Sequence, residues 1–203
     1  MTRRSALRQA IALSAFSVVW SGVVGTLAVA QAASSGSVSL LGFGADAAID
    51  AAASVALIWR FSIETTDPAR ATGVEHRAER ILGYVLIAAA VIVGLGAVRS
   101  LAVATEVEQS PVALAILVAS IVVLPALAIA KRRVSRSLAS NALRADSFLT
   151  GAAAVLAVIS LAGVVAATSF GLRWADPLGA LVISLFIARE GLGAVKESTE
   201  THA

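Results

Sequence analysis

Cysteine is absent from this chain, and charged residues are scarce. Without cysteine, disulfides, thiolate nucleophiles and cysteine metal sites are excluded. Only 14% of the 203 residues are charged and 58% are hydrophobic, whereas a soluble domain carries roughly 25% charged residues. The chain therefore has too few charges to cover a water-exposed surface. Apolar runs of about 20 residues, the length that spans a bilayer, recur along it, so we predict a polytopic membrane protein.

The apolar runs predict an all-α fold with six transmembrane helices. Arg189 and Glu190 interrupt the last run, which is the weakest of the six. The connections are short except for Ser62–Arg80, whose mixed charges and proline predict a solvated linker. We expect residues 1–203 to form a single transmembrane domain with no C-terminal cytoplasmic domain. The six predicted spans are Ile11–Ala30, Val38–Trp59, Ile81–Val98, Val112–Ala130, Phe148–Phe170 and Leu178–Val195.

The positions of the basic residues predict the orientation in the membrane. With both termini in the cytoplasm, 14 of the 16 Lys and Arg residues fall on cytoplasmic segments, and Arg99 and Arg173 fall outside. One such segment follows the fourth span and begins at Lys131. Short loops rich in Lys and Arg stay on the cytoplasmic side. This pattern explains the net charge of +3 without a nucleic-acid partner, and the chain fits a bacterial plasma (inner) membrane.

A cleavable signal peptide over Met1–Ala33 is an alternative interpretation of the first span. The segment has an Arg-bearing start, an apolar stretch and small residues near its end. Its apolar region is longer than the roughly 7–15 residues of a signal core. Cleavage would leave five spans while the basic loops still favour the inside, so we prefer six spans.

Two carboxylates lie within the second predicted span. Asp46 and Asp50 are four residues apart, so on a helix they share a face, about 6 Å apart along the axis. Asp46 lies about 14 Å from the outer end of the span, near the middle of the bilayer. A carboxylate there is costly and indicates a functional site. The pair would bind a divalent cation, or protons in its absence; alternatively, both acids are protonated or hydrogen-bonded and only hold the bundle together.

A second polar cluster begins the fifth span. Asp146 and Thr150 also share a helix face. Counted back from Phe170, however, Asp146 lies about 36 Å in, at or past the cytoplasmic boundary. Spacing alone therefore favours a carboxylate at a helix start, paired with Arg144 or with the amide groups of its own helix.

These motifs, in this order, resemble the transmembrane domain of the cation diffusion facilitator family, proton-coupled exporters of zinc and related divalent metals. Each motif is weak alone, but their order and spacing together are specific. The resemblance implies a secondary transporter rather than an enzyme, and a homodimer. The matching stretches are Ser37-Val-Ser-Leu-Leu, Asp46-x-x-x-Asp50, Arg77-Ala-Glu79, Ser140-Asn-Ala-Leu-Arg-Ala-Asp146 and Trp174-Ala-Asp176-Pro-Leu.

The resemblance implies a tetrahedral metal site with two ligands on the second span and two on the fifth. The first pair falls on Asp46 and Asp50, but the second falls on Leu149 and Ala153, which cannot bind a metal. Half of the family's site is therefore missing. In the family's register Asp146 is about level with Asp50, and a tilted or extended fifth helix would reconcile that register with the apolar length.

We therefore predict a carboxylate-rich metal site. Its ligands are Asp46, Asp50 and Asp146, with Thr150, Ser147 or water completing the shell. Carboxylates favour harder ions than the family's histidine-containing site does. Zinc is expected by resemblance, with manganese, iron(II) or cobalt as alternatives, and no tightly bound cofactor is expected besides the transported ion.

The sequence gives weaker support for a second metal site than for the transmembrane one. Relatives often bind a metal in the cytoplasmic loop, where this chain has Asp67, Glu75, His76 and Glu79. Glu75 stands where relatives have a histidine, which leaves His76 as the imidazole nearby. The alternative is that these side chains are simply solvated.

The leading prediction is a divalent-cation exporter driven by inward proton flow and working by alternating access. Two alternatives belong to other functional classes. The first is a degenerate family member that binds metal or a partner membrane protein without transport, which the loss of ligands at Leu149 and Ala153 favours. The second is an intramembrane hydrolase, for which the sequence lacks a convincing intramembrane His or Cys constellation.

Overall fold

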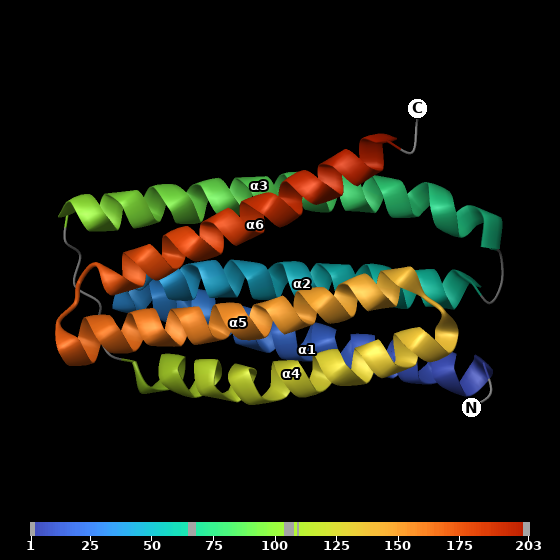
Figure 1. The fold of residues 1–203 in the computed structure, drawn as a ribbon, viewed down its shortest axis with the longest axis horizontal. Helices are drawn as coiled ribbons and strands as arrows, with labels where there is room; N and C mark the ends of the chain where they lie inside the picture. Colours follow the sequence, from blue (N-terminus) through green and yellow to red (C-terminus); the bar gives the residue numbers. More distant parts are fainter. Residues whose placement is uncertain (1–2, 65–67, 104–107, 109, 201–203) are drawn as a thin grey trace.

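The chain folds into six α-helices that lie alongside one another as an elongated bundle (Figure 1). This computed structural model describes residues 3–64, 68–103, 108 and 110–200. The all-α prediction with six helices is confirmed for these residues. The helices are α1 (Arg3–Ser35), α2 (Val38–Glu64), α3 (Pro68–Val103), α4 (Pro111–Leu138), α5 (Asn141–Phe170) and α6 (Ala175–Glu200).

Four of these helices are long and apolar enough to cross a bilayer. Among the described residues, the qualifying stretches are Ser5–Ser35, Val38–Trp59, Pro111–Leu138 and Asp146–Phe170, with a shorter apolar stretch at Ile87–Val103 in α3. By the length and composition of these helices, the chain is a membrane protein. That all six helices span the membrane stays a prediction.

The prediction of a linker over Ser62–Arg80 is wrong. α2 continues to Glu64 and α3 begins at Pro68, so most of the segment is helical. Proline is favoured at the first helical position, where its missing N–H has no partner to lose. The alanines and arginines that follow it have high helix propensity. The charges of this segment therefore belong to polar ends of α2 and α3.

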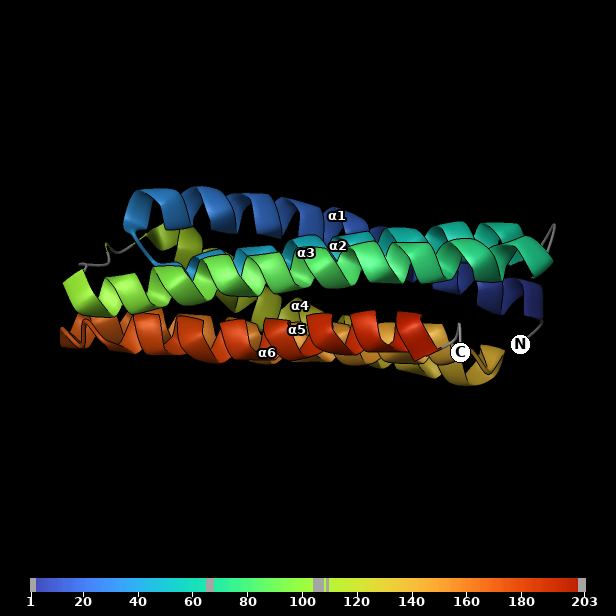
Figure 2. The ribbon, with the colours of Figure 1, turned by 90° about the horizontal axis from the view of Figure 1, so that it is seen from above.

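The helices form a group of four and a pair. α1, α2, α4 and α5 pack on one another, while α3 packs on α6 and α2, and α6 also packs against α2 and α5. In the view of Figure 2, α3 lies in front of α2 and α6 in front of α5. The start of α1 and the end of α6 lie at the same end of the bundle (Figure 1).

Glycines bring α1 and α2 into backbone contact. A Cβ added at Gly44 would lie 2.9 Å from Val29 Cγ2 and 3.1 Å from Val29 N, and one at Gly25 would lie 3.2 Å from Gly44 O. Small residues at such positions let membrane helices approach closely. The close approach allows short side chains of α1 to contact α2.

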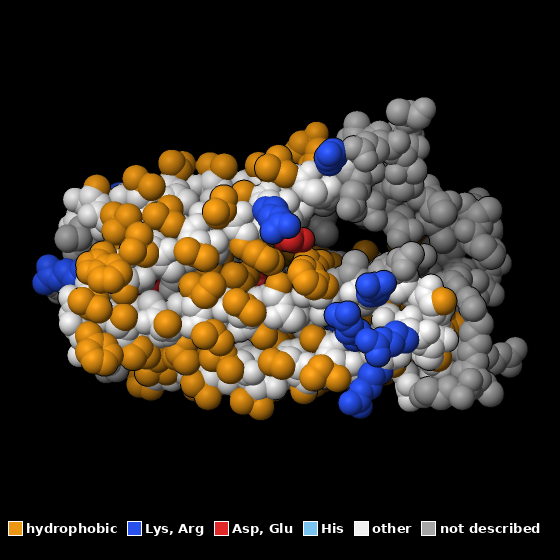
Figure 3. All heavy atoms as spheres, viewed as in Figure 1, with side chains coloured by type: hydrophobic (Ala, Val, Ile, Leu, Met, Phe, Trp, Pro, Cys, Tyr) orange, Lys and Arg blue, Asp and Glu red, His pale blue; other side chains and the backbone are white. Residues whose placement is uncertain are grey.

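The surface is mostly apolar, and its positive charges are uneven. Figure 3 shows hydrophobic side chains over most of one face, with Lys and Arg gathered toward one end. Exposed arginines surround the α4–α5 connection, at Arg132, Arg133, Arg136 and Arg144, whereas Arg99 and Arg173 are exposed toward the other end. An apolar belt with basic residues concentrated at one end is typical of a membrane protein.

The end of the bundle opposite the termini is held by a buried carboxylate. Asp176, in the first turn of α6, is fully buried. It accepts hydrogen bonds from Ser37 Oγ at 2.6 Å, from Val38 N at 2.9 Å and from Ser39 Oγ. The carboxylate thus caps the N-terminus of α2 from another helix, where a negative charge is favourable. This contact brings the Ser37-Val-Ser and Ala-Asp176-Pro motifs together in space.

Replacing Asp176 by alanine is expected to destabilise the fold. Ser37, Ser39 and the first amides of α2 would lose their acceptor inside the protein, a loss of about 1–3 kcal/mol in the free energy of unfolding. Thermal unfolding in detergent would measure it, with Glu108→Ala, an exposed acid outside the helices, as the control. Equal melting temperatures for Asp176→Ala and wild type would contradict the capping role.

Candidate cation site

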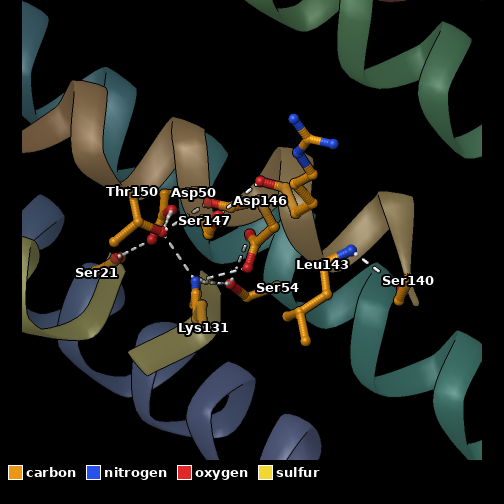
Figure 4. Close-up of polar contacts among 10 residues, drawn as sticks. Ser21, Asp50, Ser54, Lys131, Ser140, Leu143, Asp146, Ser147 and Thr150 are labelled. Carbon is orange, nitrogen blue, oxygen red and sulfur yellow. Dashed lines mark hydrogen bonds and ion pairs between the residues drawn. The ribbon is translucent and has the colours of Figure 1, made fainter. Parts of the chain in front are cut away.

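Asp50 lies inside the four-helix group, where α1, α2 and α5 meet. Its side chain is 4% exposed. Ser21 of α1 donates to Asp50 Oδ2 at 2.6 Å, and Thr150 Oγ1 of α5 lies 3.1 Å from Asp50 Oδ1 (Figure 4). Ser21 reaches Asp50 on α2, the helix that α1 approaches so closely. A carboxylate predicted from its position in a span is thus buried and bonded to two other helices.

A lysine from α4 joins this site and was missed by the sequence analysis. Lys131 is 0% exposed, and its Nζ lies 2.7 Å from Asp146 Oδ2. It also donates to Thr150 Oγ1 at 2.9 Å and to Ser54 Oγ at 3.4 Å. These three oxygen atoms match in number the three N–H bonds of an ammonium group. Figure 4 shows Lys131 pointing between Thr150 and Asp146.

The fourth predicted span ends at Ala130, one residue before Lys131, whereas α4 continues to Leu138 and carries Lys131 among its buried residues. One signal in the sequence could have found it. Leu124, Leu127, Lys131 and Val134 repeat at intervals of three and four, and all four are buried. Lys131 therefore continues the inward face of α4.

Asp146 belongs to the same network. It is 3% exposed and lies one turn inside α5, which begins at Asn141 behind the N-cap Ser140. The extended fifth helix that the family register required is thus present. The pairing with Arg144 that spacing alone favoured is not made: Arg144 is exposed, and the ion pair of Asp146 is with Lys131.

Thr150 connects the two carboxylates. Its hydroxyl accepts a hydrogen bond from Lys131 Nζ and has one proton to donate. Asp50 Oδ1 at 3.1 Å and the carbonyl oxygen of Asp146 at 3.0 Å are the acceptors in reach. Asp50, Thr150, Lys131 and Asp146 therefore form one continuous chain of polar contacts across α2, α5 and α4.

The other predicted ligands lie outside this network. Asp46 is half-buried and lies one turn from Asp50 on α2. Ser147 donates to the carbonyl of Arg144 on its own helix at 2.6 Å. Within the part of the chain that the structure describes, no group of three or more His, Asp or Glu side chains is placed to hold a metal ion.

Ala153, where the family resemblance implies a ligand, lies beside Asp50. Ala153 is buried and, together with Asp50 and Ser21, lines a small cavity of ≈ 10 Å³, about the room for one water. The rest of the lining comes from apolar side chains of α1, α2 and α4, and from Trp20. A longer side chain at Ala153 would therefore point toward the Asp50 region.

The second metal site considered from the sequence falls in the segment that follows α2. Asp67 and the side chains of Glu75, His76 and Glu79 lie outside the described residues.

The comparison with protein families decides the affiliation. The family described as the cation efflux transmembrane domain matches residues 14–201, nearly the whole chain. The chain belongs to the cation efflux family. This is the cation diffusion facilitator resemblance that the motifs indicated, and it confirms the prediction of the family. A search among curated proteins finds no match. Since the cation efflux family is a transporter family, the chain is a membrane cation transporter of this kind and a cation is its substrate.

Removing the Thr150 hydroxyl is expected to weaken the network. Thr150→Val keeps the shape of the side chain but leaves Asp50 and Lys131 each with one hydrogen bond fewer inside the protein. We expect a loss of about 1–3 kcal/mol in the free energy of unfolding. Thr168→Val is the matched control, because Thr168 on the same helix donates only to Val164 O, and its effect should stay within about 0.5 kcal/mol. Equal effects of the two variants, measured by thermal unfolding in detergent, would contradict the coupling.

Proposed function

We propose that this chain exports divalent metal ions from the cytoplasm in exchange for protons. The observation that carries the proposal is the burial of Asp50 at the meeting point of α1, α2 and α5. In a chain of the cation efflux family, a carboxylate held at such a depth is suited to binding a cation or a proton. The exchange of the two at one site couples metal export to proton entry.

The proposed membrane arrangement has six spans with both termini in the cytoplasm of a plasma membrane. It is supported by the position of the ends of α1 and α6, which lie at one end of the bundle (Figure 1). The exposed arginines around the α4–α5 connection agree with it, because cytoplasmic loops are enriched in basic residues. Residues 1–203 act as a single transmembrane domain in this proposal, and two copies form a homodimer.

The proposed ligands are Asp46, Asp50, Asp146 and Thr150. The network already joins Thr150 to the carboxylate of Asp50 and, through Lys131, to that of Asp146. Asp46 lies one turn from Asp50 on α2. An oxygen-only ligand set tilts the preference from zinc toward manganese, iron(II) or cobalt. In the transport cycle, protonation of the carboxylates releases the metal outside, and their deprotonation restores the site inside.

A second candidate is a family member that binds a metal or a partner membrane protein without transport. Two observations favour it. Leu149 and Ala153 supply no ligand where the family places two, and Lys131 already neutralises Asp146. Transport assays separate this candidate from the exporter.

The exporter is expected to accumulate metal in proteoliposomes only when a pH gradient is present. Zn, Mn, Fe(II), Co and Cd ions would be followed in wild type and in Asp46→Ala/Asp50→Ala, with Glu108→Ala as the control. We expect uptake in wild type and the control, and a loss of at least about tenfold in the double variant, because its cation site lacks two charges. No uptake of any ion by folded wild-type protein would favour the second candidate.

Replacing Asp146 distinguishes a metal site with two carboxylate ligands from one with three. If it is a ligand, Asp146→Ala should raise the metal concentration needed for half-maximal uptake by at least about tenfold, the effect of losing roughly 1.4 kcal/mol of binding energy. Flux measured over a range of metal concentrations at a fixed pH gradient would show the shift. Unchanged flux and unchanged metal affinity would rule out the three-carboxylate site.

A further inference from the structure

Lys131 is surrounded as a bound cation would be. Its Nζ lies 2.7–3.4 Å from three oxygen atoms, on Asp146, Thr150 and Ser54, which come from two other helices. All three oxygen-bearing side chains are buried. Of the 16 basic residues only Lys131 and Lys196 are lysines, and Lys196 is exposed. The amine in the site is therefore a single, distinguishable group.

The oxygen atoms around Lys131 include ligands that the metal would need. Asp146 and Thr150 belong to the proposed site, and both contact the ammonium. A divalent ion placed on these oxygens would lie within about 4 Å of a positive charge, and like charges repel more strongly in a buried site than in water. The ammonium and the metal therefore exclude each other. The described residues hold no preformed group of three metal-binding side chains, which agrees with a site already occupied by the lysine.

We propose that Lys131 is an internal competitor for the cation site: its ammonium binds the α5 oxygens that the metal uses, and metal binding displaces it. This inference rests on the proposed function for its site. It assigns Lys131 a role in setting the affinity for metal, since any ion must compete with a tethered charge for Asp146 and Thr150. Leu149 and Ala153 supply no metal ligands beside Asp146. In this proposal the ammonium of Lys131 balances the charge of Asp146 when no metal is bound.

Removal of the competitor should tighten metal binding. When the competent state is a fraction of the population, the apparent Kd is weakened by that fraction. If Lys131 leaves the oxygens at most one tenth of the time, Lys131→Met should lower the Kd for Zn²⁺ and Mn²⁺ by about tenfold or more. Isothermal titration calorimetry on detergent-solubilised protein at fixed pH would measure it.

Three variants isolate the effect. Lys131→Arg keeps the charge and should bind no more tightly than wild type. Lys196→Met removes the exposed lysine and should change nothing. Lys131→Met/Asp146→Asn removes a ligand together with the competitor, so the gain should disappear. A folded Lys131→Met that binds no more tightly than wild type would overturn the inference. Should it fail to fold, Lys131→Gln, which still donates to Asp146, takes its place with the same expectation.

A measurement on unmodified protein tests the displacement itself. With two lysines in the chain, ε-¹³C-lysine labelling gives two signals. Saturation with Zn²⁺ should shift the signal of Lys131 and leave that of Lys196 in place. Zinc bound to the protein without a shift at Lys131 would overturn the inference.

Transport is scored separately, in proteoliposomes. Tighter binding by Lys131→Met in a protein that transports no ion would support the competitor and reject the exporter. Transport by wild type without tighter binding in Lys131→Met would support the exporter and reject the competitor.

Discussion

The buried ion pair between Lys131 and Asp146 is the contact on which the arrangement of this site depends. A charge inside an apolar bundle is tolerated only when a partner of opposite sign and further hydrogen bonds surround it. Here the pair joins α4 to α5 at 2.7 Å. Thr150 extends it to Asp50 on α2, and Ser21 extends it to α1. The polar network therefore connects all four helices of the group.

The two ends of the bundle use buried carboxylates differently. Asp176 accepts bonds from neutral hydroxyl and amide groups at the start of α2, so its charge is matched by the helix end that it caps. Asp146 is matched by the ammonium of Lys131, which in our proposal a metal ion displaces. The first arrangement holds helices in place, and the second suits a site whose occupant changes. Burial alone does not distinguish them, whereas the nature of the partners does.

One departure of this chain from the pattern that the family resemblance implies lies on α5. The second helix has both acidic residues that the resemblance implies, Asp46 and Asp50, while α5 has Leu149 and Ala153 at the positions where the resemblance implies ligands. The structure shows a small cavity at Ala153 and an ammonium group one to two turns away, on Asp146 and Thr150. The polar groups of α5 thus lie nearer the end of the helix at Ser140 than Ala153 does, and a side chain of α4 contacts them.

The sequence by itself determined the membrane class, the six helices, the inward face of Asp46 and Asp50 and, through its motifs, the family. These features follow from composition and from periodicity along one helix, which are local. The site of Lys131, the bond from Ser21 to Asp50 and the cap formed by Asp176 were decided only by the tertiary structure. Each joins residues 29 to 139 positions apart or lies past a predicted helix end. Such contacts depend on how closely whole helices approach, and that distance is set by packing between glycines and side chains of different helices.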